Sequence, residues 1–166
     1  MTTRFKAPRR KDRSIGLRVK SPAFYSGERI PVEYTVLGGN ESPELTWAEL
    51  PPETVALALL CEDPDAAGQD PFVHWLVANI HPVQPGDTIP RGVGDIPGAV
   101  LGRNGYGRIG YDGPAPPPGK VHHYHFRLYA LDVPLSLDDG FTRFDLIRAM
   151  QGHVIATGEL MGTYSR

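Results

Sequence analysis

Hydrophobic residues recur at two-residue intervals over much of this chain, which is the spacing of strands with one face in a core. The clearest stretch is Val121–Asp132. One face of this predicted strand carries His122, Tyr124, Phe126, Leu128 and Ala130. The other face carries Val121, His123, His125, Arg127, Tyr129 and Leu131. Imidazoles and a phenol therefore stand at the start of a strand that can enter a core.

Further extended segments are predicted on both sides of this strand. They are Ile15–Ser21, Ile30–Val36, Leu45–Trp47, Val55–Cys61, Phe72–Ile80 and His153–Tyr164. Val55–Cys61 is apolar throughout, as expected for a strand buried on both faces. In His153–Tyr164 we expect Gly158 and Gly162 to interrupt the extended run.

One helix is predicted, and it starts after Phe141. Thr142 can cap its first turn, Asp145 completes a capping box, and Phe141 can pack on Leu146 as a hydrophobic staple. Gly152 is expected to end the helix. The apolar face consists of Leu146, Ile147 and Met150. A short helix among many strands predicts a mostly-β sandwich or barrel-like domain with a few peripheral helices.

A long loop region separates the predicted strands in the second half of the chain. His81–Gly119 is interrupted by Pro and Gly almost throughout, and the whole chain has 19 Gly and 17 Pro. Pro fixes φ and Gly admits conformations closed to other residues, so Gly110–Lys120 is predicted to be a stiff, turning loop. A connection of this length in a compact domain is typically functional.

Length and charge narrow the possible functions. We expect one domain over residues 15–166 of the 166, preceded by a basic, poorly ordered tail at residues 1–14. A net charge of −2 predicts neither nucleic acid nor a membrane surface as a partner. The single cysteine, Cys61, fits a reducing cytoplasm. No apolar run approaches the ~20 residues of a membrane span, so stable insertion is not expected.

Four polar residues are the best candidates for a ligand site. Asp63 and His74 come from neighbouring strand ends, and His122 and Tyr124 start the clearest strand. They supply an acceptor, two titratable rings and a phenolic hydroxyl. The glycine-rich segment Asn104–Tyr111 could add backbone amides for an anion. The alternatives are that Asp63 shapes a turn before Pro64 and that His74 is a core histidine.

Other chemistries are weakly supported. His123 and His125 share a strand face, which suits a metal, but no third ligand stands at a recognised spacing. No Gly-x-Ser-x-Gly motif is present, and Cys61 ends a buried strand. We therefore expect no metal, no cofactor and no enzymatic nucleophile, and favour a binding protein. A regulator acting through a protein partner is one alternative, and a weak hydrolase is another.

Several segments together resemble the phosphatidylethanolamine-binding proteins. Asp63–Ala66 followed by Phe72–Trp75 is similar to the first signature of that family. The second signature is matched by Gly102-x-Asn104, by Gly110-Tyr111-x-Gly113-Pro114, by Pro117-Pro118-Gly119 and by His122-x-Tyr124. Ala130–Asp132 and His153–Tyr164 resemble the bacterial and archaeal, Raf-kinase-inhibitor-like branch. The match covers nearly everything after the basic tail.

The resemblance implies a β-sandwich with a pocket for a small phosphate-like or carboxylate anion. The residues that match the family's binding positions are Asp63, His74, His122 and Tyr124, with Gly110, Tyr111, Pro117 and Pro118 at the rim. It also implies a possible protein partner and a homodimer. Three departures stand out: Ala67 replaces a second proline, His123 replaces an arginine, and no C-terminal helical extension follows.

Overall fold

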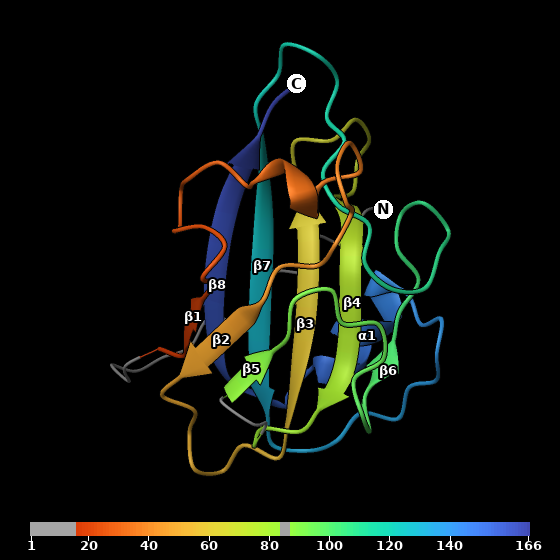
Figure 1. Cartoon of the computed structure of the whole chain (residues 1–166). Helices are drawn as coiled ribbons and strands as arrows, with labels where there is room; N and C mark the ends of the chain where they lie inside the picture. Colours follow the sequence, from red (N-terminus) through yellow and green to blue (C-terminus); the bar gives the residue numbers. More distant parts are fainter. Residues whose placement is uncertain (1–15, 84–86) are drawn as a thin grey trace.

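Two antiparallel sheets form the fold, and they face each other in a sandwich (Figure 1). The computed structural model describes residues 16–83 and 87–166. The predicted tail at residues 1–14 therefore lies outside the described residues. The smaller sheet has the order β1-β2-β5 and consists of β1 (Arg18–Lys20), β2 (Leu45–Ala48) and β5 (Thr88–Ile89).

The larger sheet has the order β6-β4-β3-β7-β8. It consists of β6 (Val100–Leu101), β4 (Phe72–Ile80), β3 (Ala56–Asp63), β7 (His122–Leu131) and β8 (Val154–Tyr164). The α-helix α1 (Arg143–Met150) lies behind this sheet, and the short 3-10 helix η1 (Val32–Tyr34) lies at one end of the sandwich (Figure 1). The predicted mostly-β sandwich with short peripheral helices is confirmed.

Each face of the larger sheet buries its own hydrophobic cluster. The cluster between the two sheets includes Trp75, Val77, Tyr124, Phe126 and Leu128. The cluster beneath α1 includes Leu60, Leu76, Ala78, Tyr129 and Leu146. All eight residues of β3 are buried, because this strand is central and covered on both sides. The predicted alternation of β7 is confirmed.

The capping signals of α1 act as the sequence predicts. Thr142 accepts a hydrogen bond from the Asp145 amide, and the Asp145 side chain accepts one from the Thr142 amide. Phe141 and Leu146 belong to the same buried cluster, which is consistent with the predicted staple. Gly152 takes a φ of 79° just beyond the helix, a conformation that glycine adopts without strain.

The predicted strand at Ile30–Val36 is wrong. The burial expected for one strand face is absent, since Ile30 and Tyr34 are buried while Val32 and Val36 are exposed. The backbone instead turns locally: the Tyr34 amide donates to the Pro31 carbonyl, and Pro31 itself has no amide for a sheet partner. The apolar period of two in the sequence therefore does not decide which side chains reach the core here, because side-chain pattern alone does not specify the backbone partners.

The predicted interruption of the last strand by glycine is also wrong. β8 is continuous over Val154–Tyr164 and pairs with β7 along its whole length. A Cβ at Gly158 would lie 2.2 Å from the Leu17 carbonyl oxygen, and one at Gly162 would lie 2.5 Å from an Ile30 side-chain carbon. The glycines therefore let the N-terminal segments approach the strand closely rather than break it.

Within the described part of the chain, no helix has the length and apolar character needed to cross a membrane.

Candidate functional site

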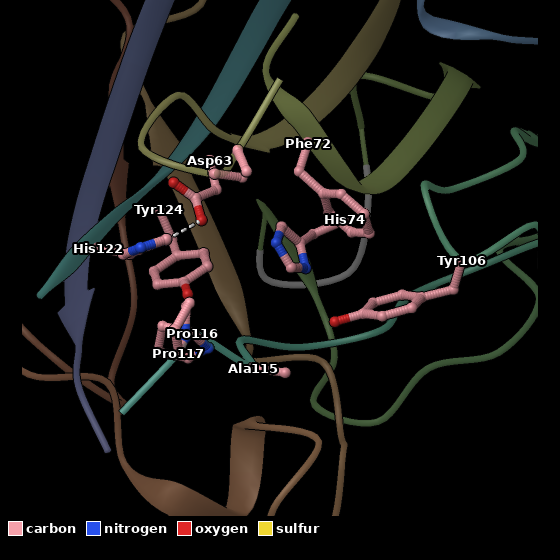
Figure 2. Close-up of a pocket in the computed structure, with 11 residues that line it drawn as sticks. Asp63, Phe72, His74, Tyr106, Ala115, Pro116, Pro117, His122 and Tyr124 are labelled. Atoms are coloured by element: carbon pink, nitrogen blue, oxygen red, sulfur yellow. Dashed lines mark hydrogen bonds and ion pairs between the residues drawn. The ribbon is translucent and has the colours of Figure 1, made fainter. Parts of the chain in front are cut away.

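A pocket of about 240 Å³ opens where β3 ends, β4 begins and β7 begins. Its lining combines aromatic, imidazole and carboxylate side chains, many of which Figure 2 labels. The lining residues are Asp63, Ala66, Ala67, Phe72, His74, Tyr106, Ala115, Pro116, Pro117, His122 and Tyr124. Antiparallel pairing of β3 with both neighbours brings these three strand termini together at one end of the sheet.

His122 and Asp63 form a buried pair at this end of the sheet. The His122 Nδ1 lies 2.7 Å from the Asp63 Oδ2, with the two side chains 7% and 4% exposed (Figure 2). The other carboxylate oxygen of Asp63 accepts a hydrogen bond from the Asp65 amide. An ionised carboxylate only accepts, so His122 Nδ1 carries a proton and its Nε2 is the nitrogen left for a ligand.

A β-bulge places His74 in the pocket. In the β3–β4 ladder Cys61 pairs with Trp75 and Glu62 pairs with Val73, so His74 is the extra residue without a partner in β3. Trp75 belongs to the cluster between the sheets, and His74 lines the pocket on the same side. An unbroken strand would point these two neighbours to opposite faces, so the bulge redirects the imidazole.

The ring of His74 is fixed from behind by a main-chain carbonyl. Its Nδ1 lies 2.7 Å from the Asp112 carbonyl oxygen, and a carbonyl can only accept, so Nδ1 donates and Nε2 is left for a ligand. Burial lowers the pKa of His74, while the hydrogen bond to Asp112 and the charges of Asp63 and Asp112 oppose that effect. The neutral ring is therefore favoured over a wider pH range than for an exposed histidine.

Asp112 holds this carbonyl in place through its own side chain. The buried carboxylate accepts hydrogen bonds from the side chains of Asn40, Asn104 and Arg108, with Arg108 bound in a two-pronged arrangement. The Asp112 amide in turn donates to the His74 carbonyl. Asp112 thus bonds both the ring and the main chain of His74, so these hydrogen bonds fix the loop against the bulge.

The amides of Asn104–Tyr111 do not form the open anion nest that the glycine-rich sequence suggests. The Asn104 side-chain oxygen accepts hydrogen bonds from the amides of Tyr106 and Arg108. The amides of Gly105, Gly107 and Gly110 donate to main-chain carbonyls. These donors build the loop itself, so the loop contributes side chains to the pocket instead.

Tyr106 is the main contribution of this loop, and sequence reasoning missed it. Its ring lies 4.8 Å from that of Phe72 and 6.2 Å from that of His74, both edge-on. Its hydroxyl is directed toward the cavity (Figure 2). A Cβ at Gly105 would lie 2.6 Å from the Phe72 ring, which explains the small residue next to it. The one indication in the sequence is that Tyr106 lies between two glycines, Gly105 and Gly107.

Tyr124 forms the wall between the imidazoles and the core. The residue is 1% exposed, and the centre of its ring lies 5.2 Å from that of the His74 ring at a steep angle. Burial, with the charge of Asp63 adding to it, raises the pKa of Tyr124. Burial also raises the pKa of Tyr106. Both phenols therefore keep their protons near neutral pH and can donate hydrogen bonds.

The structure brings together the core of the predicted site. Asp63, His74, His122, Tyr124 and Pro117 all line the pocket. The other three predicted residues, Gly110, Tyr111 and Pro118, are not among its lining residues. The Tyr111 hydroxyl donates to the Tyr34 carbonyl and its ring packs on Trp75, so this side chain belongs with the core between the sheets. Sequence reasoning also missed Phe72, which faces Tyr106.

His123 and His125 lie on the opposite face of β7 and take carboxylate partners of their own. His123 Nδ1 lies 2.7 Å from Asp65, and His125 Nδ1 lies 3.0 Å from Glu159. The described residues contain no group of three or more His, Cys, Asp or Glu arranged to hold a metal ion. These two rings are therefore surface ion-pair groups in this fold.

Fold and pocket together define a class of protein: a β-sandwich with a small, rigid, histidine-containing pocket at the ends of its central strands. The family model for phosphatidylethanolamine-binding protein matches residues 20–165. The chain belongs to the phosphatidylethanolamine-binding protein family.

Relatives share both sequence and fold over almost the entire domain. A UPF0098 protein from Methanothermobacter thermautotrophicus is 44% identical over 153 residues, which cover 90% of this chain and 99% of that protein. A phosphatidylethanolamine-binding protein homologue from Chlamydia trachomatis has 41% identity and a TM-score of 0.85, covering 92% of this chain and 99% of its own. E. coli YbcL has 31% identity, the same TM-score and the same coverage.

Proposed function

We propose that the pocket binds a small anion, either a phosphate-like group or a carboxylate. The observation that carries this proposal is the shared arrangement of its two imidazoles. His74 and His122 each donate from Nδ1 to an acceptor of the protein, so each keeps Nε2 for a ligand. When a ring is protonated, Nε2–H donates to an anion and adds positive charge. The hydroxyls of Tyr106 and Tyr124 are further donors at the same pocket.

Asp63 favours particular anions over others. Its carboxylate lies in the pocket wall and repels a bare dianion unless a proton or an ammonium group lies between them. A protonated phosphate monoester or a phosphate that carries an amine meets that condition. The family's name refers to a phospholipid whose headgroup joins a phosphate to a primary amine, and this supports the same ligand chemistry.

Calorimetric titration at pH 6 tests the proposal with inorganic phosphate, phosphoethanolamine, acetate and sulfate. We expect phosphoethanolamine and phosphate to bind more tightly than sulfate, which remains a dianion at this pH. His122→Asn keeps a donor toward Asp63 but removes Nε2, so it should weaken phosphate binding.

The matched control is His123→Asn, which changes the neighbouring histidine of the same strand outside the pocket. It should bind phosphate as the wild type does. Absence of heat with all four anions would overturn the proposal, and so would equal phosphate affinity of His122→Asn and wild type.

A further inference from the structure

The two imidazoles of the pocket differ in what stands behind them. His74 Nδ1 donates to a neutral carbonyl, while His122 Nδ1 donates to the Asp63 carboxylate. The carboxylate balances the charge of a protonated His122 ring. Burial lowers the pKa of His74 and favours its neutral ring. One ring is thus suited to accept a proton at Nε2 and the other to donate one, which is the pattern of a general acid–base pair.

The side chains that line the pocket include no serine, threonine, cysteine or lysine. Asp63 has both oxygens in hydrogen bonds, one to His122 and one to the Asp65 amide. The lack of such a nucleophile disfavours an enzyme that forms a covalent intermediate. A substrate that carries its own nucleophile does not need one, because an acid–base pair is then the chemistry that the protein must supply.

We propose that the pocket cyclises small phosphodiesters that carry a hydroxyl group on the carbon next to the ester-bearing carbon. The substrate hydroxyl oxygen attacks phosphorus and forms a new P–O bond, while its proton passes to Nε2 of neutral His74. The P–O bond to the leaving alcohol breaks, and Nε2–H of protonated His122 donates its proton to that oxygen. The products are a five-membered cyclic phosphodiester and an alcohol. Proton exchange with water then restores both rings.

The remaining lining fits this substrate class. A phosphodiester carries a single negative charge, so it avoids the repulsion that Asp63 imposes on a dianion. The hydroxyls of Tyr106 and Tyr124 can donate to the non-bridging oxygens, where charge increases in the transition state. A pocket of about 240 Å³ accommodates a phosphate with short arms and not a folded polynucleotide. This activity rests on the proposed anion binding, because the substrate is itself an anion.

Two synthetic diesters separate the roles of the two rings. In 2-hydroxypropyl 4-nitrophenyl phosphate the leaving group needs no proton, so only the base is required. In 2-hydroxypropyl ethyl phosphate the leaving alkoxide needs a proton, so both base and acid are required. Bis(4-nitrophenyl) phosphate lacks the hydroxyl and should not react. Release of nitrophenolate is measured by absorbance and the cyclic product by phosphorus NMR, at neutral pH with EDTA present.

The variants His74→Asn and His122→Asn retain a donor near the Nδ1 position and lose Nε2. His74→Asn should slow both diesters by about 100-fold or more, the usual contribution of a general base. His122→Asn should slow the ethyl ester by a similar factor and the nitrophenyl ester by less than about 10-fold. His123→Asn should leave both rates unchanged. Thermal unfolding checks that each variant folds.

Three results would overturn the activity: no cyclic product from the wild type, equal cleavage of the diester without a hydroxyl, or rates that neither variant changes. Calorimetric titration of phosphate on the same samples separates the two proposals. Phosphate binding without turnover overturns the cyclisation and leaves the anion-binding function standing. Absence of both overturns both.

Discussion

The two faces of β7 carry the same kind of ion pair in opposite surroundings. His122 faces the pocket and pairs with Asp63, whereas His123 faces outward and pairs with Asp65. Both Nδ1–oxygen distances are 2.7 Å, but the inner side chains are at most 7% exposed and the outer ones are more than 40% exposed. Geometry alone does not distinguish the two pairs, and burial does.

Burial changes what each pair can do. Water screens the outer pair, so its attraction contributes little to stability. The inner pair is fixed in one tautomer, because losing either partner leaves a buried polar group unsatisfied. A rigid Nε2 at a cavity is positioned to form a hydrogen bond with a ligand there, whereas the Nε2 of an exposed ring is hydrated. The face of the strand, and not the residue type, therefore decides which imidazole lines the pocket.

The largest effect is expected from the aromatic core of the inner face. Phe126→Ala should lower the free energy of unfolding by about 3–5 kcal/mol, because the ring is fully buried and its loss leaves a cavity. The outward His125→Ala should cost under about 1 kcal/mol, since His125 pairs with Glu159 at the surface. Chemical denaturation measures both. Equal losses would mean that the register of β7 is one residue off.

Removing the histidine of each pair compares the stability that the buried and the exposed pair contribute. His122→Ala removes one partner of a buried pair and should cost about 3 kcal/mol, while His123→Ala should cost under about 1 kcal/mol. Urea unfolding of both variants at pH 7 measures the difference. A loss for His123→Ala as large as that for His122→Ala would contradict the role given to burial.

Phosphate binding should depend on pH through the inner face. From about pH 8 to about pH 6 affinity should rise roughly tenfold, since phosphate takes up its second proton over that range and the Asp63 carboxylate then accepts a hydrogen bond from it instead of repelling it. Asp63→Asn removes the carboxylate and should flatten this dependence while improving the relative binding of sulfate. Calorimetry at three pH values measures it. A dependence that Asp63→Asn leaves intact would remove the role given to Asp63.

The smallest effect concerns stability as a function of pH. Burial lowers the pKa of His74 in the folded protein, so the unfolded chain binds more protons between the two pKa values. Stability should therefore decrease as pH falls below about 6.5, the ordinary histidine value. His74→Asn should lose this decrease, and His123→Asn should retain it. Urea unfolding from pH 7.5 to 5.5 compares the slopes, and an unchanged slope in His74→Asn would contradict the burial effect.

The sequence predicted the parts of the fold whose determinants are local. The alternation of β7, the continuous burial of β3 and the capping box at Thr142 follow from spacing along the chain. The 3-10 turn at Val32–Tyr34 is held by local backbone hydrogen bonds that the side-chain pattern does not show, and the close approach to Gly158 involves a segment distant in sequence. Propensity and period do not encode such partners, so these predictions failed.

The candidate site was predictable to the same extent. Asp63, His74 and His122 come from strand ends with recognisable polar residues, and the family resemblance pointed to the same positions. Tyr106 and the carboxylate of Asp112 were missed, because a glycine-rich loop without periodicity does not indicate which of its side chains turns inward. The tautomers of the two histidines required the identity of their acceptors, which only the folded chain provides.

The bulge at His74 has a consequence for how this family can diverge by changes of length. With one extra residue, β4 supplies Trp75 to the core and His74 to the pocket from adjacent positions. Deleting Val73 would restore a regular ladder, turn the imidazole to the outer face and leave Trp75 in the core. Loss of a single codon would thus remove the imidazole from the pocket and leave the sandwich core intact, so the pocket can be lost without redesign of the core.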